Sequence, residues 1–191
     1  MLNKKVVDYF FKQAAIGEWD NINFLKIEKK FKLERNSIKK QLEDKIFFLH
    51  NYDRFIDKKV MKSVSNEDFN ISSPEEIIQE YIMNKLDFMN QHKLAISNIF
   101  NFYLSNPKFY LISLKSSKAS IELYLNKFYF TRSNIKKKVL EKALLVILLL
   151  AIKKWLYEDN NNSMSYAIID KGIKRIKNNS QLFEAVNKTK I

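Results

Sequence analysis

Residues 27–45 read IEKKFKLERNSIKKQLEDK, and this stretch decides both the expected fold of the chain and the place where its charge gathers. The apolar side chains Phe24, Ile27 and Phe31 recur at three- and four-residue spacing, which predicts a short amphipathic helix. A second short helix is predicted from Asn36 to about Leu42, after a tight link. Residues 26–40 hold seven basic side chains and only two acidic ones, so the predicted helix pair is strongly cationic.

Helical periodicity continues on both sides of this pair. A first helix is predicted over residues 3–15. Ser72 or Ser73 before Pro74 is a helix-start signal after the polar link SNEDFNISSP, residues 65–74. The helices predicted after the pair cover residues 46–64, 74–91, 94–103, 108–130, 133–155 and 163–177.

The composition favours an all-α protein. Only two of 191 residues are glycine and two are proline, so the tight turns of hairpins and phosphate-cradling loops are nearly absent. The lack of cysteine excludes disulfides and thiolate metal sites and is compatible with a reducing cytoplasm. Because the N-terminal apolar stretch is short and interrupted by Asp8, no signal peptide is expected. We therefore expect a cytoplasmic all-α protein that binds no metal and no cofactor.

The formal net charge of +13 has two explanations. Nucleic acid and anionic membranes gain affinity from each lysine or arginine that lies near their phosphates. A genome rich in A and T would equally give many lysine, asparagine and isoleucine codons and few glycine codons. The charge alone leaves both explanations open.

The most apolar segment runs from Ala143 to Ile152, with lysines close on both sides. It is about half of the roughly 20 residues that a bilayer span needs, so we expect a buried helix and no transmembrane segment. A helix that is apolar on nearly all sides must be covered all round, and a symmetric dimer interface supplies that cover. We therefore predict a homodimer whose interface includes Leu144, Ile147, Leu148, Ala151 and Trp155. In the closing helix, the pattern places four side chains inward: Met164, Ala167, Ile168 and Ile176.

The order of these elements resembles the TetR-like family of transcriptional regulators, in which three short helices precede a long connecting helix and an apolar helical body. Residues 27–45 align without a gap with the helix-turn-helix stretch of that family, and GEWDNINFLKI before them is similar to its Gly-Trp segment. The residues that match the pattern in kind are Ile27, Leu33, Ile38 and Lys45, with Leu42 in place of a phenylalanine. Two later segments, IIQEYIMNKLDFMNQHKLAI and WLYEDNNNSMSYAIIDKGIKRI, are similar to an alphaproteobacterial branch.

This resemblance implies a helix-turn-helix head over residues 1–45 and a ligand-binding and dimerisation body over residues 46–191. Three positions depart from the family pattern. Lys32 stands in place of a turn glycine, which predicts strain at a positive φ. Glu34 replaces a helix-capping serine and would repel a phosphate at the helix N-terminus. Lys39 replaces a tyrosine that often contacts phosphate, and it restores a cationic contact.

The function that the resemblance implies is that of a DNA-binding repressor that responds to a small apolar ligand. Lysines would contact the DNA backbone, while Arg35, Asn36 and Ser37 early in the third helix carry the groups for reading bases. The predicted DNA contacts are Lys26, Lys29, Lys30, Lys32, Arg35, Asn36, Ser37, Lys39, Lys40 and Lys45. The alternative is that these residues form the solvated face of a lysine-rich protein.

A lipid-binding accessory protein of ubiquinone biosynthesis shares the TetR fold and has a degraded helix-turn-helix, so it provides a second hypothesis. In such proteins the body holds an isoprenoid, and the late helices meet a partner enzyme or a membrane surface. The candidate pocket residues are Phe100, Tyr103, Tyr110, Tyr124 and Phe128, although aromatics at helical spacing are also typical of an ordinary core. Asp87 and His92 are five residues apart, off one helical face, and no catalytic motif is present, so we do not expect an enzyme.

Overall fold

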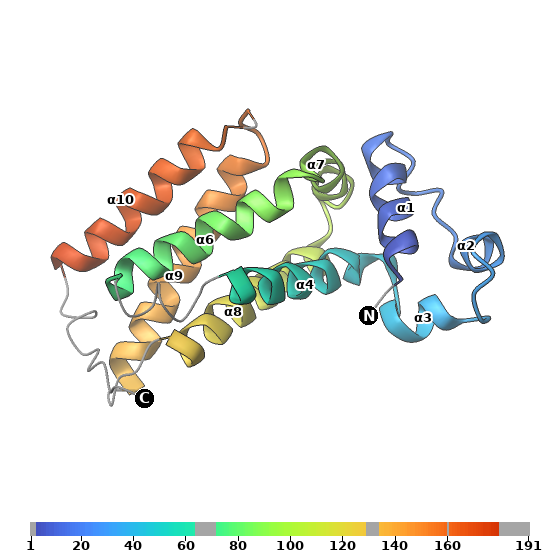
Figure 1. The fold of residues 1–191 in the computed structure, drawn as a ribbon. Helices are drawn as coiled ribbons and strands as arrows, with labels where there is room; N and C mark the ends of the chain where they lie inside the picture. The colour runs from blue at the N-terminus through green and yellow to red at the C-terminus, as the bar shows by residue number, and fades with distance from the viewer. Residues whose placement is uncertain (1–2, 64–71, 129–133, 160, 180–191) are drawn as a thin grey trace. The chain divides into compact units, whose positions relative to one another are not determined.

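The computed structural model describes residues 3–63, 72–128, 134–159 and 161–179, and all regular structure in these ranges is helical (Figure 1). The predicted all-α class is therefore confirmed. The helices are α1 Lys4–Ala15, α2 Phe24–Lys30, α3 Ser37–Leu42, the 3-10 turn η1 Lys45–Phe47, α4 Phe48–Ser63, α6 Pro74–Asn90, α7 Lys93–Phe102, α8 Pro107–Phe128, α9 Asn134–Trp155 and α10 Ser163–Asn179. Each corresponds to a predicted helix. Most of the predicted link at residues 65–74 lies outside the described residues.

Side-chain caps explain where several of these helices begin. The Asn3 carboxamide oxygen accepts a hydrogen bond from the Lys5 backbone N–H at 2.9 Å, at the start of α1. At the start of α6, the Glu76 carboxylate accepts from the Ser73 N–H at 2.7 Å, and the Ser73 hydroxyl accepts from the Glu76 N–H at 3.3 Å. These bonds to Ser73 lower the pKa of Glu76 below its usual value. The predicted start signal before Pro74 is therefore a complete capping box.

The chain forms two compact units, and α4 and α8 contribute residues to both. The head unit comprises residues 1–54 and 91–114, and the body unit comprises residues 55–90 and 115–191. The head unit therefore includes α7 in addition to the predicted residues 1–45. The reason is that α7 packs on α1, where the Asn98 carboxamide donates to the Ala14 and Ala15 carbonyl oxygens at 2.9 and 3.3 Å.

Aromatic rings form the centre of the head unit. Phe10 and Phe11 of α1 each lie 4.9 Å from the ring of Phe48 at the start of α4, in edge-to-face contact. Trp19 joins the same cluster and is buried. Phe11 also stacks on His92 with 3.9 Å between ring centroids. This core fixes α1 against the start of α4, and the helix pair α2–α3 is built beside it.

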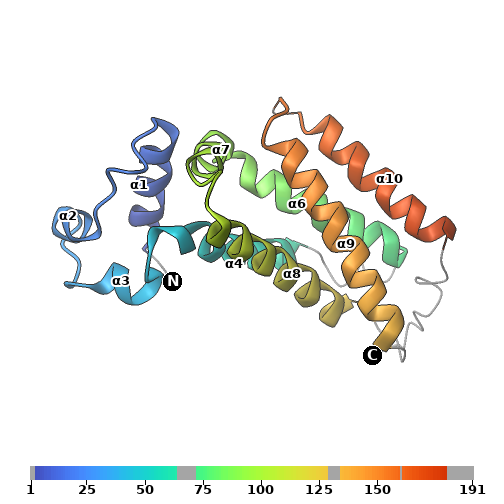
Figure 2. The ribbon, with the colours of Figure 1, turned by 180° about the vertical axis from the view of Figure 1, so that it is seen from behind.

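In the body unit, α10 packs along α9 and α6 (Figures 1 and 2). Gly172 of α10 lies so close to Ile147 that a β-carbon there would be 2.7 Å from the isoleucine side chain. The indole N–H of Trp155 donates to the Asn90 carboxamide oxygen at 2.7 Å, which ties α9 to α6. None of the described helices has a stretch long and apolar enough to cross a bilayer.

Two sequence predictions about the body unit require correction. All five predicted dimer-interface residues, Leu144, Ile147, Leu148, Ala151 and Trp155, are buried within the single chain. Because α6 and α10 already cover that side of α9, these side chains form core rather than a surface for a second copy. In α10 the buried residues are Ser165, Ile169 and Ile173, so the predicted inward face is rotated; Met164 is 55% exposed and Ala167 is also exposed.

Candidate nucleic-acid interface

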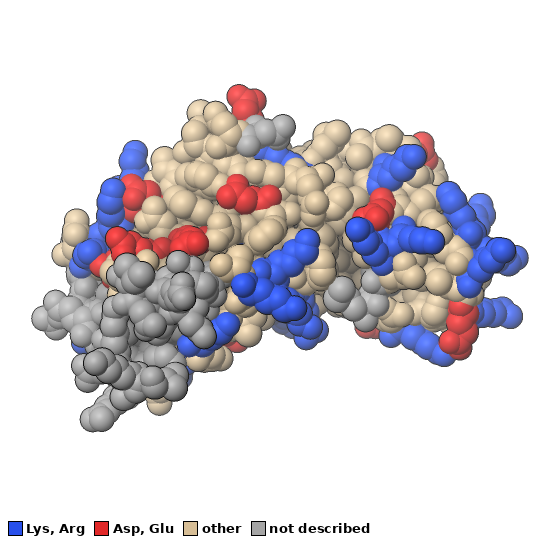
Figure 3. Space-filling model, in the orientation of Figure 1, with Lys and Arg blue, Asp and Glu red and all other residues tan. Residues whose placement is uncertain are grey.

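The helices α2 and α3 bury their apolar side chains and expose their cations. Ile27 of α2 packs inward, as do Ile38 and Leu42 of α3, and each is at most 2% exposed. The basic side chains on the outer faces are Lys26, Lys29 and Lys30 of α2 and Lys39 and Lys40 of α3, all exposed. Figure 3 shows cations gathered over this end of the chain. The predicted amphipathic helix pair is therefore present.

The turn between α2 and α3 contains the strain predicted for it. Lys32 has a φ of 53°, in the left-handed region that favours glycine. Its N–H donates to the Lys29 carbonyl oxygen at 3.3 Å, and the Leu33 N–H donates to the Glu28 carbonyl oxygen at 2.9 Å. These bonds close the end of α2 around a left-handed residue, as in a Schellman-type C-cap. A lysine thus occupies the backbone conformation for which the family pattern has glycine.

Glu28 supplies the cap of α3, a role that the sequence analysis did not assign. Its carboxylate is buried and accepts hydrogen bonds from the Asn36 N–H at 2.8 Å and the Ile38 N–H at 2.9 Å. Asn36, the N-cap residue, makes no capping bond with its own side chain, and its φ is 61°. Glu34 is exposed, and its carboxylate instead meets the Lys40 ammonium at 3.3 Å.

These bonds determine how the start of α3 can meet an anion. The Ser37 N–H, between the two amides that Glu28 binds, donates to the Glu34 carbonyl oxygen at 3.1 Å. The three consecutive amides at residues 36–38 therefore all have acceptors within the protein. A phosphate at this surface would be bound by side-chain cations rather than by the N-terminal amides of α3.

The predicted contacts differ in how they are placed. Six of them are exposed and have no ion pair or ring contact among the described residues: Lys26, Lys29, Lys32, Arg35, Asn36 and Lys39. Lys30 is exposed and its ammonium lies 4.3 Å from the centre of the Tyr9 ring, while Lys40 is paired with Glu34. Lys45 is only partly exposed and donates to the Trp19 and Asp20 carbonyl oxygens at 3.3 and 2.8 Å. The Ser37 hydroxyl oxygen is buried and has no hydrogen-bond partner among the described residues.

Lys45 and Ser37 are therefore placed to support the head rather than to touch DNA. The Lys45 ammonium holds the loop between α1 and α2 through two carbonyl oxygens. A hydroxyl oxygen that is closed off from solvent, as in Ser37, does not reach a base edge. Of the three residues predicted to read bases, Arg35 and Asn36 remain exposed.

The predicted pocket aromatics do not form one group. Phe100, Tyr103 and Tyr110 of the head unit all contact the ring of Phe109, which is buried. Tyr124 belongs to the body unit, packs on Tyr81 at 4.7 Å and is 2% exposed. Burial raises the pKa of Tyr124 well above its usual value. The side chain of Phe128 lies outside the described residues. Tyr103 and Tyr124 therefore serve as core packing, whereas Tyr110 is 42% exposed.

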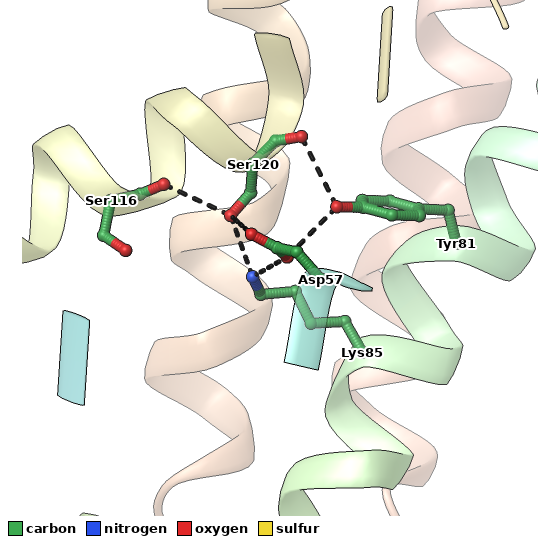
Figure 4. A network of polar contacts seen from close by, with 5 residues as sticks. All are labelled: Asp57, Tyr81, Lys85, Ser116 and Ser120. Atoms are coloured by element: carbon green, nitrogen blue, oxygen red, sulfur yellow. Dashed lines mark hydrogen bonds and ion pairs between the residues drawn. The ribbon is translucent and has the colours of Figure 1, made fainter. Parts of the chain in front are cut away.

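A buried polar network joins three helices of the body unit (Figure 4). The Lys85 ammonium of α6 lies 2.5 Å from the Asp57 carboxylate of α4. The Ser120 hydroxyl of α8 contacts both groups, at 2.9 Å from Lys85 and 2.7 Å from Asp57, and the Tyr81 hydroxyl donates to Asp57 at 3.1 Å. Nearly complete burial of the pair leaves no path for a substrate to reach it. The network holds α4, α6 and α8 together, so its role is structural.

A polar groove of about 600 Å³ lies between α6 and α10, where Figure 3 shows acidic side chains. None of the predicted pocket aromatics lines it. Its acids are largely satisfied within the protein: Glu75 pairs with Lys177, Asp170 pairs with Lys174, and Asp87 accepts from Tyr166. Burial, followed by contacts with Asp87 and Glu158, raises the pKa of Tyr166 to about 12. Three of the acidic side chains that line the groove are therefore neutralised or bonded within the protein.

Comparison of the chain with models of known protein families, with curated proteins and with solved structures finds no match. The function is therefore inferred from the residues of the head unit and their geometry.

Proposed function

We propose that this chain is a TetR-like DNA-binding regulator whose α2 and α3 grip the phosphate backbone. The observation that carries the proposal is the outward cationic face of these two helices. Lys26 and Lys29 on α2 and Lys39 on α3 are exposed, while Ile27 and Ile38 of the same helices are buried. A short helix pair with a buried apolar side and an exposed basic side is what a helix-turn-helix needs against a duplex.

The solvated-face alternative predicts cations without groups for base recognition. Two features at the start of α3 favour DNA over that alternative. Arg35 is exposed, and its guanidinium can donate two hydrogen bonds to a guanine edge. Asn36 is exposed and leaves its carboxamide unused as a helix cap, so this group is open to pair with adenine. The lysines would then position the protein on the DNA backbone, and Arg35 and Asn36 would contact the base edges, as in known DNA-binding proteins.

A charge-matched pair of variants tests the proposal. Replacing Lys26, Lys29 and Lys39 by alanine removes three exposed cations from the proposed face. The matched control replaces three lysines that are exposed on α4, α8 and α10, Lys58, Lys115 and Lys171. Both variants lower the net charge equally, so a general loss of attraction to a polyanion affects both alike.

We expect the head variant to lose duplex binding and the control to keep it, as measured by fluorescence anisotropy with a labelled duplex. If the three lysines each neutralise a phosphate, the slope of log affinity against log salt becomes shallower by about 2.7 in the head variant, where binding is still measurable. Circular dichroism should show that both variants remain helical. Equal affinity of the two variants would refute the proposed face.

The regulator hypothesis includes a homodimer, and α9 has an apolar face that is exposed among the described residues. Val139, Val146 and Leu150 are 49–55% exposed and lie seven and four residues apart, so they share one side of α9. We propose that this side, in place of the five buried residues first predicted, meets the second copy. An apolar stripe on a helix of this length is suited to pairing in a four-helix interface.

The lipid-binding hypothesis makes a different prediction for the purified protein. It requires an extractable isoprenoid or phospholipid, which native mass spectrometry detects directly. The packing of Tyr124 and of the aromatics around Phe109 gives this hypothesis no specific support. Weak duplex binding together with a co-purifying lipid would favour it over the regulator.

A further inference from the structure

We propose that Glu28 is the positioning residue of the DNA-binding head, fixing how α3 presents Arg35 and Lys39 to the duplex. This inference rests on the proposed function and identifies the group that aligns its recognition helix. Glu28 lies on α2, yet both of its carboxylate oxygens accept backbone bonds from the first turn of α3. A single side chain therefore joins the two helices of the proposed interface.

The local backbone explains why α3 depends on this contact. α3 is only six residues long, and a helix of that length is unstable by itself. Asn36 at its N-cap is left-handed and makes no side-chain cap bond. Lys32, in the preceding turn, is also left-handed without being glycine. The usual sources of order at a helix start are thus missing, and the Glu28 carboxylate takes their place.

The position of the charge adds a second consequence. The Glu28 carboxylate sits where a DNA phosphate would otherwise approach the N-terminus of α3. It occupies the amides of Asn36 and Ile38, so the helix cannot use them for the DNA backbone. DNA affinity then comes from the exposed lysines, while selectivity depends on the orientation that Glu28 gives to α3. Replacing Glu28 should therefore lower the selectivity for a DNA sequence and leave the general affinity for DNA nearly unchanged.

Glu28→Gln is the informative variant because it keeps the size of the side chain and replaces one acceptor by a donor. The new amide group would face a backbone N–H instead of accepting from it. Glu34→Gln is the matched control, since it removes the same charge from the neighbouring link between α2 and α3. The Glu34 carboxylate is exposed and pairs with Lys40, and among the described residues it caps no amide of α3. Glu28→Ala is a second variant, which removes the acceptors without placing an amide donor against a backbone N–H.

Two measurements decide the proposal. The first is amide hydrogen exchange at Asn36 and Ile38, at a temperature where circular dichroism shows every variant folded. The second is the ratio of affinities for a selected duplex and a random duplex. We expect faster exchange at both amides and a ratio lowered roughly 10- to 100-fold in the Glu28 variants, the effect of losing one charge-assisted hydrogen bond. Random-duplex affinity and its salt slope should stay near those of the wild type, as should both readouts in Glu34→Gln.

Equal selectivity in Glu28→Gln and Glu34→Gln would overturn the proposal, as would unchanged exchange at Asn36 and Ile38. If the wild type itself shows no preference for any selected duplex, the proposed function fails. In that case the role of Glu28 toward DNA is refuted as well. The exchange data would still report whether its carboxylate orders α3.

Discussion

Removing one partner of the buried pair Asp57–Lys85 should destabilise the body unit far more than removing both. The two charged groups lie 2.5 Å apart. The Asp57 side chain is 6% exposed and the Lys85 side chain 1%, so water cannot solvate either charge when its partner is removed. In Asp57→Ala, the Lys85 ammonium loses its carboxylate partner and keeps the contact with the neutral Ser120 hydroxyl, at 2.9 Å. An uncompensated charge in such a place costs about 3–5 kcal/mol of unfolding free energy. Total stabilities are about 5–15 kcal/mol, so this is a large share.

The test is a double-mutant cycle by urea denaturation with Asp57→Leu, Lys85→Met and the two together. Each single variant should lose about 3 kcal/mol or more, because each leaves one buried charge. The double variant should be more stable than the sum of the singles predicts, by at least about 1 kcal/mol, since apolar side chains fill the space and no charge remains. Single losses below 1 kcal/mol, or strict additivity, would refute the view that the two charges depend on each other.

Further predictions concern the turn, alkaline stability and the dimer. Lys32→Gly should be more stable than Lys32→Ala by about 1 kcal/mol in thermal melts, because only glycine relieves the positive φ; the opposite order would mean that the turn is unstrained. Burial raises the pKa of Tyr52 from 10.0 to about 12, so folded and unfolded states differ in protonation only above pH 10. The contribution of the neutral Tyr52 to the free energy of unfolding should be complete below pH 10 and decline toward pH 12. Urea titrations should find that the unfolding free energy of Tyr52→Phe declines less over this range than that of the wild type. An identical decline in both proteins would exclude Tyr52 as the cause. The double variant Val146→Glu, Leu150→Glu should be a monomer in analytical ultracentrifugation, where the wild type should be a dimer. The control Leu94→Glu, also at an exposed apolar residue, should remain a dimer. An unchanged mass of the double variant would locate the interface elsewhere.

The helices could be predicted from the sequence because their signals are local. Apolar residues at three- and four-residue spacing marked α1, α2 and α3, and the start of α6 followed from Ser73 and Pro74. The positive φ at Lys32 also followed from the sequence, because the aligned family pattern has glycine there. Such features depend only on neighbouring residues, so tertiary packing did not alter them.

Features that depend on contacts between distant helices were not predictable in this way. Glu28 was counted as one of two acids in a basic stretch, yet its partners are eight and ten residues further along the chain. No short motif has that spacing, and only the folded turn brings the groups together. The burial of Trp155 likewise depends on α6, through Asn90. A continuous apolar run shows that a helix is covered, but not whether its own chain or a second copy covers it.

The rotated face of α10 has a similar cause. The sequence pattern gave weight to Met164 and Ile176, but Gly172 allows α10 to approach Ile147 closely. This approach turns Ile169 and Ile173 into the core and leaves Met164 outside. Gly172 therefore lies on the side of α10 that packs against α9, together with the buried Ile169 and Ile173.

The most direct test of the central claim is binding of the purified wild-type protein to a labelled duplex from the DNA upstream of its own coding sequence, with random duplex as competitor, across a series of salt concentrations. We predict a preference for the upstream duplex that persists at physiological salt, with an affinity that falls as salt rises because lysines of α2 and α3 displace counterions. Weak binding that disappears equally for both duplexes would contradict the regulator and leave the basic face of the head as a general polyanion surface.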